Sequence, residues 1–315
     1  MNPWLILSLS VLALVAAAAL IALVCYRIAF YNPKAKKADP DRIDIPEGEI
    51  YEPFRPQMTE WVRWTRSLPC EKLEITSHDG LTLRGKFYEY APGAPIELMF
   101  HGYRGDAERD LSGGVARCFA LGRSVLIVDQ RSCGESAGKA ITFGICEHLD
   151  CLRWVDFAVG YFGADCKIIL TGISMGASTV LMAAGKQLPP NVIGVLADCG
   201  FTSAREIMAQ VIRQMGLPPI LVYPFVKLGA KLYGGFDLEQ CSALEAAANI
   251  QVPVIFFHGE QDDFVPFRMS QALYDACQSR KKLVIVPNAG HGLAFPVDQQ
   301  AYLDALNEFF GPEAS

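Results

Sequence analysis

Short apolar runs of strand length alternate with longer stretches of helical pattern through most of the chain. Eight runs are apolar enough for buried strands, and they cover residues 71–76, 81–90, 96–101, 124–129, 167–172, 192–198, 252–258 and 282–287. Strands that alternate with helices are typical of a mostly parallel sheet. The pattern therefore predicts an α/β fold with an eight-stranded, mostly parallel sheet flanked by helices.

The first thirty residues follow another pattern. The 23 residues from Trp4 to Tyr26 carry no charge, and a helix of that length can cross a bilayer. Met1-Asn2-Pro3 lacks the basic region of a secretory signal, and Ala22-Leu23-Val24 lacks the small residue expected just before a lipoprotein cysteine at Cys25. We therefore expect residues 1–30 to form an uncleaved transmembrane anchor.

Basic residues follow the apolar stretch, at Arg27, Lys34, Lys36, Lys37 and Arg42. Since positive charge is retained on the cytoplasmic side, we expect the rest of the chain to be cytoplasmic. Prolines at 33, 40, 46, 53 and 56 indicate an extended linker, and Trp61, Trp64 and Leu68 share one face of a helix that should pack on the domain. Residues 31–70 are thus predicted as a linker and pre-domain helix, and residues 71–315 as the main domain.

The stretch Gly172-Ile173-Ser174-Met175-Gly176 reads G-x-S-x-G. It follows an apolar strand pattern and leads into a helical pattern at 177–184. Strand, sharp turn and helix are the context of a nucleophile elbow, which exposes a serine hydroxyl above a sheet edge. A serine needs a base to take its proton, so the acid and the histidine are sought downstream in that order.

His291 is the predicted base, because it lies in a loop after the last strand pattern and has the required order. The other four histidines fit other roles. His78 lies in a predicted hairpin turn, and His148 lies in a helical pattern. His101 and His258 end strands, where backbone hydrogen bonds usually hold a histidine.

Five motifs together resemble the α/β-hydrolase superfamily, in particular the serine aminopeptidase S33-like and other bacterial α/β-hydrolases. They are His101-Gly102-Tyr103, the segment Asp129 to Ser136, the elbow, H-G-x-x-D-x-x-V-P at 258–266 and Gly290-His291-Gly292. The resemblance covers residues 71–310 and implies an α/β-hydrolase fold and hydrolysis, but this fold serves many substrates. Ser132-Cys133 replaces the usual Gly-His in a segment that is generally structural.

The resemblance implies that Asp262 is the orienting acid. Asp263 is adjacent and expected to be solvated, whereas Asp198 stays an alternative because some relatives place the acid after that earlier strand. An oxyanion needs two N–H donors. The backbone of Met175 should supply one, and the resemblance implies that the backbone of Tyr103 supplies the other.

Residues 201–248 separate the sixth and seventh strand patterns, where α/β-hydrolases insert a lid. The segment is apolar, and Pro218-Pro219 divides it. A small helical lid would form an apolar acyl pocket over Ser174. The alternative is a pair of ordinary packed helices without a gating role.

Composition excludes several other classes. The net charge is −6 and the domain has no basic cluster, so we expect no nucleic-acid partner. Ten scattered cysteines fit a reducing cytoplasm better than a disulfide framework. Cys146, His148 and Cys151 do not share a helix face and lack a fourth ligand, so we expect no metal, and no motif requires a cofactor.

The sequence therefore predicts a membrane-anchored serine hydrolase. Ser174, His291 and Asp262 would cleave an ester or thioester of a small-molecule or lipid-like acid through an acyl-enzyme. An S33- or S9-like peptidase is the alternative within the same class. A non-catalytic binding or scaffold protein is the alternative from another class, although such proteins often lose a member of the triad.

Overall fold

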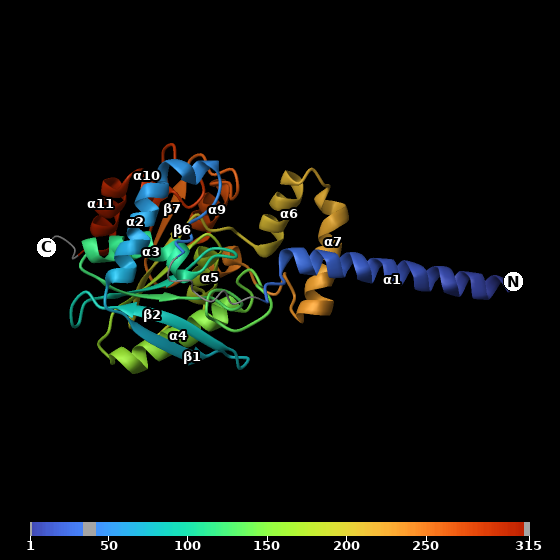
Figure 1. Cartoon of the computed structure of the whole chain (residues 1–315), viewed down its shortest axis with the longest axis horizontal. Helices are drawn as coiled ribbons and strands as arrows, with labels where there is room; N and C mark the ends of the chain where they lie inside the picture. The colour runs from blue at the N-terminus through green and yellow to red at the C-terminus, as the bar shows by residue number, and fades with distance from the viewer. Residues whose placement is uncertain (1, 34–41, 312–315) are drawn as a thin grey trace.

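Eight strands form one sheet in the computed structural model, which describes residues 2–33 and 42–311. Their order across the sheet is β1-β2-β4-β3-β5-β6-β7-β8 (Figure 1). β2 is antiparallel to both of its neighbours, and the other pairs are parallel. The strands are β1 Glu71–Thr76, β2 Thr82–Tyr88, β3 Ile96–Phe100, β4 Ser124–Val128, β5 Ile168–Ile173, β6 Val192–Asp198, β7 Val254–Gly259 and β8 Lys281–Val286. The predicted sheet is confirmed, with every strand end within two residues of its expected place.

Helices cover both faces of the sheet. α4, α5, α8 and α9 pack on one face, and α2, α3, α10 and α11 pack on the other. The helices are α1 Pro3–Ala29, η1 Glu49–Phe54, α2 Arg55–Ser67, α3 Ala107–Ala120, α4 Glu147–Phe162, α5 Met175–Ala184, α6 Ala204–Gln214, α7 Pro219–Gly229, the π-helical turn η2 Ala230–Gly234, α8 Ala243–Ala247, α9 Arg268–Ala276, α10 Ala294–Val297 and α11 Gln299–Phe310. This layered arrangement is that of an α/β-hydrolase.

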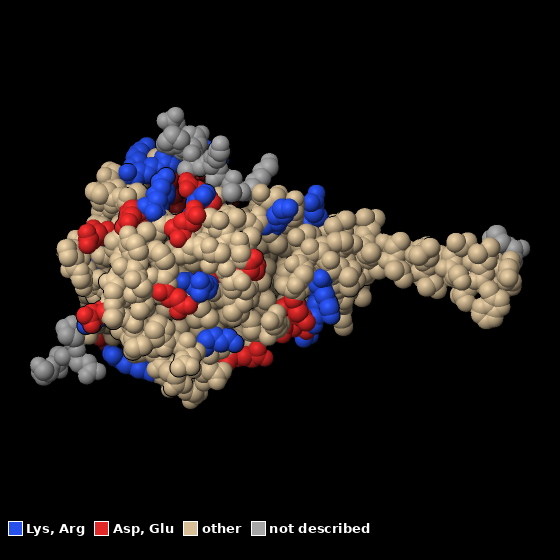
Figure 2. Space-filling model, turned by 90° about the horizontal axis from the view of Figure 1, so that it is seen from below, with Lys and Arg blue, Asp and Glu red and all other residues tan. Residues whose placement is uncertain are grey.

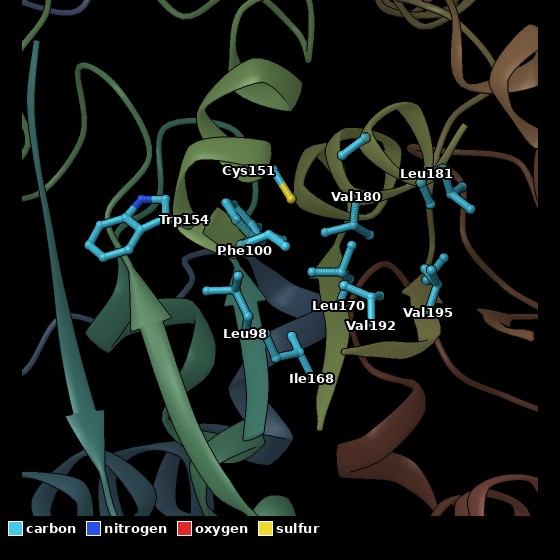
Figure 3. Packing of buried hydrophobic residues seen from close by; sticks show 14 of the residues in the cluster. Leu98, Phe100, Cys151, Trp154, Ile168, Leu170, Val180, Leu181, Val192 and Val195 are labelled. Atoms are coloured by element: carbon cyan, nitrogen blue, oxygen red, sulfur yellow. The ribbon is translucent and has the colours of Figure 1, made fainter. Parts of the chain in front are cut away.

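The central strands are mostly apolar because both faces of the sheet are buried. In β3, Leu98 and Phe100 pack toward Trp154 of α4 and Val180 of α5 (Figure 3). Met99 points to the opposite face and joins the cluster around α3. Successive side chains of a strand alternate between faces, so a mostly apolar strand contacts two separate layers of helices.

Glu97 is the charged exception in β3, and it is fully buried. Its carboxylate accepts hydrogen bonds from Arg117 at 2.5 Å, Arg123 at 2.6 Å and Thr171 at 2.9 Å. Burial alone raises the pKa of Glu97, but the two arginines outweigh it and lower the pKa to about 2. The strand therefore tolerates a buried carboxylate because two guanidinium groups neutralise it.

The C-terminal end of α1 packs on the domain. Phe30, which directly follows α1, is fully buried and makes edge-to-face contacts with Phe143 at 5.9 Å and Phe236 at 5.3 Å. Tyr31 forms an isolated antiparallel bridge with Ala140. The same apolar cluster includes residues of α6 and α7 and the first residue of α5. The end of the N-terminal segment is therefore part of the core that supports the elbow.

We predict that Phe30→Ala lowers the free energy of unfolding by about 3–5 kcal/mol, because truncating a buried phenylalanine leaves a cavity. Ile28→Ala is the matched control, since Ile28 lies two residues before Phe30, at the end of α1, and is 60% exposed. Thermal unfolding of both full-length variants in detergent tests this. Equal melting temperatures would show that the end of α1 does not stabilise the domain.

The pre-domain helix α2 packs on the domain, as predicted. Trp61 stacks on Phe295 at 5.4 Å, and Trp64 contacts the edge of Phe119 at 5.3 Å. Gly113 of α3 lies so close to Trp61 that an added Cβ would stand 2.8 Å from the indole. Residues 49–67 thus pack over α3 and α10 rather than forming a free linker, and we call them the cover segment.

Candidate active site

Ser174 lies on a sharp turn between β5 and α5. Its backbone has φ 56° and ψ −117°, a strained conformation for any residue with a side chain. A Cβ on Gly172 would overlap the backbone of Gly176, and a Cβ on Gly176 would overlap the carbonyl oxygen of Phe100. The turn can therefore close only with glycine on both sides of the serine.

The structure brings the three predicted triad residues together. His291 Nε2 lies 2.9 Å from Ser174 Oγ, and His291 Nδ1 lies 2.7 Å from Asp262 Oδ2. Asp262 follows β7 and His291 follows β8, so both loops leave the carboxyl edge of the parallel strands, as the serine does. The Tyr51 hydroxyl donates a hydrogen bond of 3.0 Å to the carbonyl oxygen of His291.

The Asp262 carboxylate is held on both oxygens. Oδ1 accepts hydrogen bonds from the backbone N–H of Phe264 at 3.0 Å and of Val265 at 2.8 Å. His258 Nε2 lies 3.1 Å from Oδ2. Burial raises the pKa of Asp262, but the hydrogen bonds with His258 and His291 lower it to about 2. The carboxylate is ionised at neutral pH and can orient an imidazole.

His258 has a second role that its sequence pattern does not predict. Its Nδ1 lies 2.7 Å from Ser270 Oγ, and its Nε2 lies 2.7 Å from the Val265 carbonyl oxygen as well as close to Asp262. The expected backbone contact is present, yet the histidine also supports the carboxylate. The four-residue spacing between His258 and Asp262 was the signal that could have indicated this.

The two alternative acids lie elsewhere. Asp198 Oδ2 accepts a hydrogen bond of 3.0 Å from the Tyr302 hydroxyl, and Oδ1 has no partner among residues 2–33 and 42–311. Burial raises the pKa of Asp198. Asp263 is exposed, and its carbonyl oxygen accepts a hydrogen bond from Gln214. Within the described chain, neither carboxylate hydrogen-bonds to His291.

The loop after β3 passes beside the nucleophile. A Cβ built on Gly102 would stand 3.6 Å from Ser174 Cβ, and the N–H of Gly102 donates to Asp110 Oδ2 at 3.1 Å. The N–H groups of Tyr103 and Met175 have no acceptor in the part of the chain that the structure describes. Both predicted donors are thus free to meet an oxyanion.

A cavity of about 230 Å³ adjoins Ser174 and His291. Most of its lining is apolar, and Tyr51, Met58 and Trp61 of the cover segment contribute to it. Of the described residues, none between 204 and 234 lines it. The sequence placed the acyl pocket under the 201–248 insertion, whereas this cavity lies toward α2 and α3. The position of the cavity depends on tertiary packing, because the cover segment crosses the sheet edge and lines it.

Two clusters of possible metal ligands occur among the described residues. One consists of Cys199, Asp262 and His291 and coincides with the predicted acid and base. The other consists of His78, Asp79 and Asp150, and Arg131 donates to both of its carboxylates, at 2.9 Å and 2.6 Å. A guanidinium group already neutralises the second cluster, so the arrangement does not favour a cation.

Residues 144–314 match the model of the prolyl oligopeptidase family. The matched range includes the elbow and the loops of Asp262 and His291. The chain belongs to the prolyl oligopeptidase family. Membership in this family makes the protein a serine hydrolase and confirms the resemblance to α/β-hydrolases. An S9-like peptidase is one of the alternatives that the sequence leaves open.

Several curated proteins are similar to this member of the prolyl oligopeptidase family. YqkD of Bacillus subtilis is 31% identical over 190 residues, which are 60% of this chain and 62% of YqkD. The alignment thus spans less than two thirds of that relative. Rv2307c of Mycobacterium tuberculosis is 28% identical over 75% of this chain and 77% of its own. Bem46 of Schizosaccharomyces pombe is 25% identical over 69% of this chain and 68% of Bem46.

Solved structures of the same fold include esterases and a peptidase. The Pyrococcus furiosus esterase Pf2001 superimposes with a TM-score of 0.65 at 22% identity, over 88% of this chain and 98% of its own. The Pyrococcus horikoshii acylaminoacyl peptidase superimposes with a TM-score of 0.57 at 15% identity, over 80% of this chain and 44% of the peptidase. These likenesses establish the α/β-hydrolase fold of this prolyl oligopeptidase family member, and they leave the substrate open.

Proposed function

We propose that this serine hydrolase cleaves carboxylic esters or thioesters through Ser174, His291 and Asp262. The observation that supports this most strongly is the unbroken chain of contacts from Ser174 Oγ to His291 to Asp262, at 2.9 Å and 2.7 Å. His291 Nε2 takes the hydroxyl proton while Oγ attacks the acyl carbonyl, and Asp262 stabilises the imidazolium that forms. The N–H groups of Tyr103 and Met175 receive the oxyanion.

The tetrahedral intermediate then collapses. The bond from the acyl carbon to the leaving oxygen or sulfur breaks, and His291 returns its proton to the leaving group. Water next loses a proton to His291 and attacks the acyl-enzyme, and the same proton restores the Ser174 hydroxyl as the acid departs.

The cavity beside Ser174 favours an apolar acyl group. Its volume and its apolar lining, which includes Trp61 and Phe295, suit an aliphatic or aryl acid better than a charged peptide. The rival is a peptidase, which the prolyl oligopeptidase family and the acylaminoacyl peptidase likeness keep open.

A substrate screen separates the two. The full-length chain in detergent is assayed on p-nitrophenyl esters of graded chain length beside aminoacyl-p-nitroanilides. The full chain is required because Phe30 lies in the core. We expect turnover of the esters and little of the anilides. Turnover of the anilides alone would assign the protein to the peptidases.

We further propose that α1 is an uncleaved anchor with the domain in the cytoplasm. α1 is a candidate membrane span with a mean hydropathy of 2.7. Tyr26 near its end and Phe30 directly after it are buried against the domain, and removal of a signal peptide would undo the packing of Tyr26. Arg27 and Arg42 follow the apolar stretch. The further basic residues at 34, 36 and 37, and the proline at 40, lie outside the described residues.

Fusions after Ser315 test this orientation. Because the basic residues should keep the domain inside, we expect a green fluorescent protein fusion to be bright and an alkaline phosphatase fusion to be inactive. An active phosphatase fusion would place the domain outside the cytoplasm.

A further inference from the structure

An apolar surface covers the insertion that follows β6. Of the described residues outside α1, eleven large apolar side chains are exposed, and six of them belong to this one segment. These six are Met215, Leu217, Ile220, Leu221, Leu232 and Tyr233. Figure 1 shows α6 and α7 beside α1, away from the layers of the main domain. We call these six residues the insertion surface. A soluble protein rarely concentrates exposed apolar side chains in this way.

Contacts with α1 fix the level of the insertion surface along that helix. The Tyr233 hydroxyl donates a hydrogen bond of 2.9 Å to the carbonyl oxygen of Ala19, and Gly229 packs against the backbone of Ala22. Residues 3–19 extend beyond this level, and they span about 25 Å at 1.5 Å per residue. That length approaches the roughly 30 Å of a bilayer core. A bilayer crossed by α1 therefore reaches the insertion surface.

Other contacts at the C-terminal end of α1 orient the catalytic edge. The Tyr103 hydroxyl donates to the carbonyl oxygen of Ala29 at 2.8 Å, and Arg104 donates to that of Ile28 at 2.7 Å. Asn32 donates to the Ser132 carbonyl oxygen at 2.7 Å. These partners lie in the loops after β3 and β4, at the carboxyl ends of the parallel strands. Since the Ser174 turn also lies at this edge, the edge faces the side from which α1 departs.

Charge agrees with this placement. On the face shown in Figure 2, Lys and Arg side chains lie near the base of α1 with Asp and Glu side chains beside some of them, while the protruding part of α1 shows no charged side chain. Arg27 and Lys231, on α1 and η2, are both exposed. Cations at this level match the anionic headgroups of a membrane surface.

We propose that the insertion surface lies in the interface of the bilayer that α1 crosses, and that Ser174 acts on acyl lipids drawn from that bilayer. The substrate class rests on the proposed serine esterase function, whereas the placement of the insertion surface does not. Tyr233 would lie at the membrane–water interface, where aromatic side chains are enriched. The loop of Tyr103 would connect this interface to the oxyanion site.

Fluorescence quenching tests the placement without reference to catalysis. Full-length Leu221→Trp is reconstituted in phosphatidylcholine vesicles with and without acyl-brominated phosphatidylcholine, and the wild-type signal is subtracted. The matched control is Gln300→Trp on α11, an exposed site at the opposite end of the molecule (Figure 1). We expect brominated lipid to quench the added indole at 221 and not at 300. Equal quenching at both sites would overturn the proposal. An indole at 221 that is shielded from acrylamide but not quenched by lipid would also overturn it, because a second protein copy would then cover the insertion surface.

Activity tests the substrate class. The double variant Ile220→Glu with Leu221→Glu places two charges on the insertion surface, and Gln300→Glu with Asn307→Glu adds the same charge on α11. The measured quantity is the turnover of p-nitrophenyl palmitate in vesicles divided by that of p-nitrophenyl butyrate in solution. We expect the first variant to lower this ratio about tenfold and the control to leave it unchanged. An unchanged ratio in both variants would overturn the lipid substrate. If the wild-type protein hydrolysed neither ester, the esterase proposal and the lipid substrate would be contradicted, and the placement of the insertion surface would not.

Discussion

Ser174→Ala is expected to abolish covalent labelling by a fluorophosphonate probe and to lower kcat on any ester substrate by a factor on the order of 10⁶. The hydroxyl supplies the atom that bonds to the acyl carbon, so no neighbouring group replaces it. The fold should survive, because the strain of the turn comes from the backbone at Ser174 and its flanking glycines. Labelling of the full-length variant, followed on a gel, measures the effect.

Ser67→Ala is the matched control, because Ser67 is an exposed serine at the end of α2. It should keep wild-type labelling and turnover. A folded Ser174→Ala protein that still reacts with the probe at the wild-type rate would show that another residue is the nucleophile. An unlabelled wild-type protein would favour the scaffold alternative.

Asp262→Asn is expected to lower kcat by a factor on the order of 10²–10⁴, with little change in KM. The Asp262 carboxylate accepts the Nδ1–H of His291 at 2.7 Å and thereby leaves Nε2 free to take the serine proton. An amide can present its NH₂ group instead and stabilise the wrong tautomer. Substrate binding does not involve this contact, so the loss should fall on turnover.

Asp198→Asn and Asp263→Asn are the matched controls, and each should lose far less. The larger effect of Asp198→Asn should fall on stability, because this carboxylate is buried and bonded to Tyr302. Measuring kcat on one ester beside melting temperatures separates the two effects. If a well-folded Asp198→Asn showed the greatest loss of kcat, the acid would lie at the end of β6.

The acid titration of stability offers an independent check on Asp262. Its pKa is lowered from 3.8 to about 2, so its ionised form stabilises the folded state above pH 3.8 and this contribution is lost as the pH falls toward 2. The destabilisation caused by Asp262→Asn should therefore shrink across that window. A constant difference in unfolding free energy would mean that the hydrogen bonds with His258 and His291 do not lower the pKa.

The sequence by itself determined the eight strands and the elbow, because both depend on local properties. A run such as residues 96–100 is apolar at nearly every position since both of its faces are buried, and that can be read without knowing the partners. G-x-S-x-G constrains the turn through the absence of side chains at Gly172 and Gly176, which is also a local property.

Only the tertiary structure decided which distant segments meet at the site. Tyr51 and Trp61 were expected in a linker and a packing helix, yet they reach the cavity and His291 because the cover segment crosses the sheet edge. Ala29 was part of a predicted anchor, yet it accepts a hydrogen bond from Tyr103. Such contacts join residues tens to hundreds of positions apart, and their energy depends on how whole layers pack. Hydrophobic periodicity indicates that a face is buried, whereas the packed chain decides what buries it.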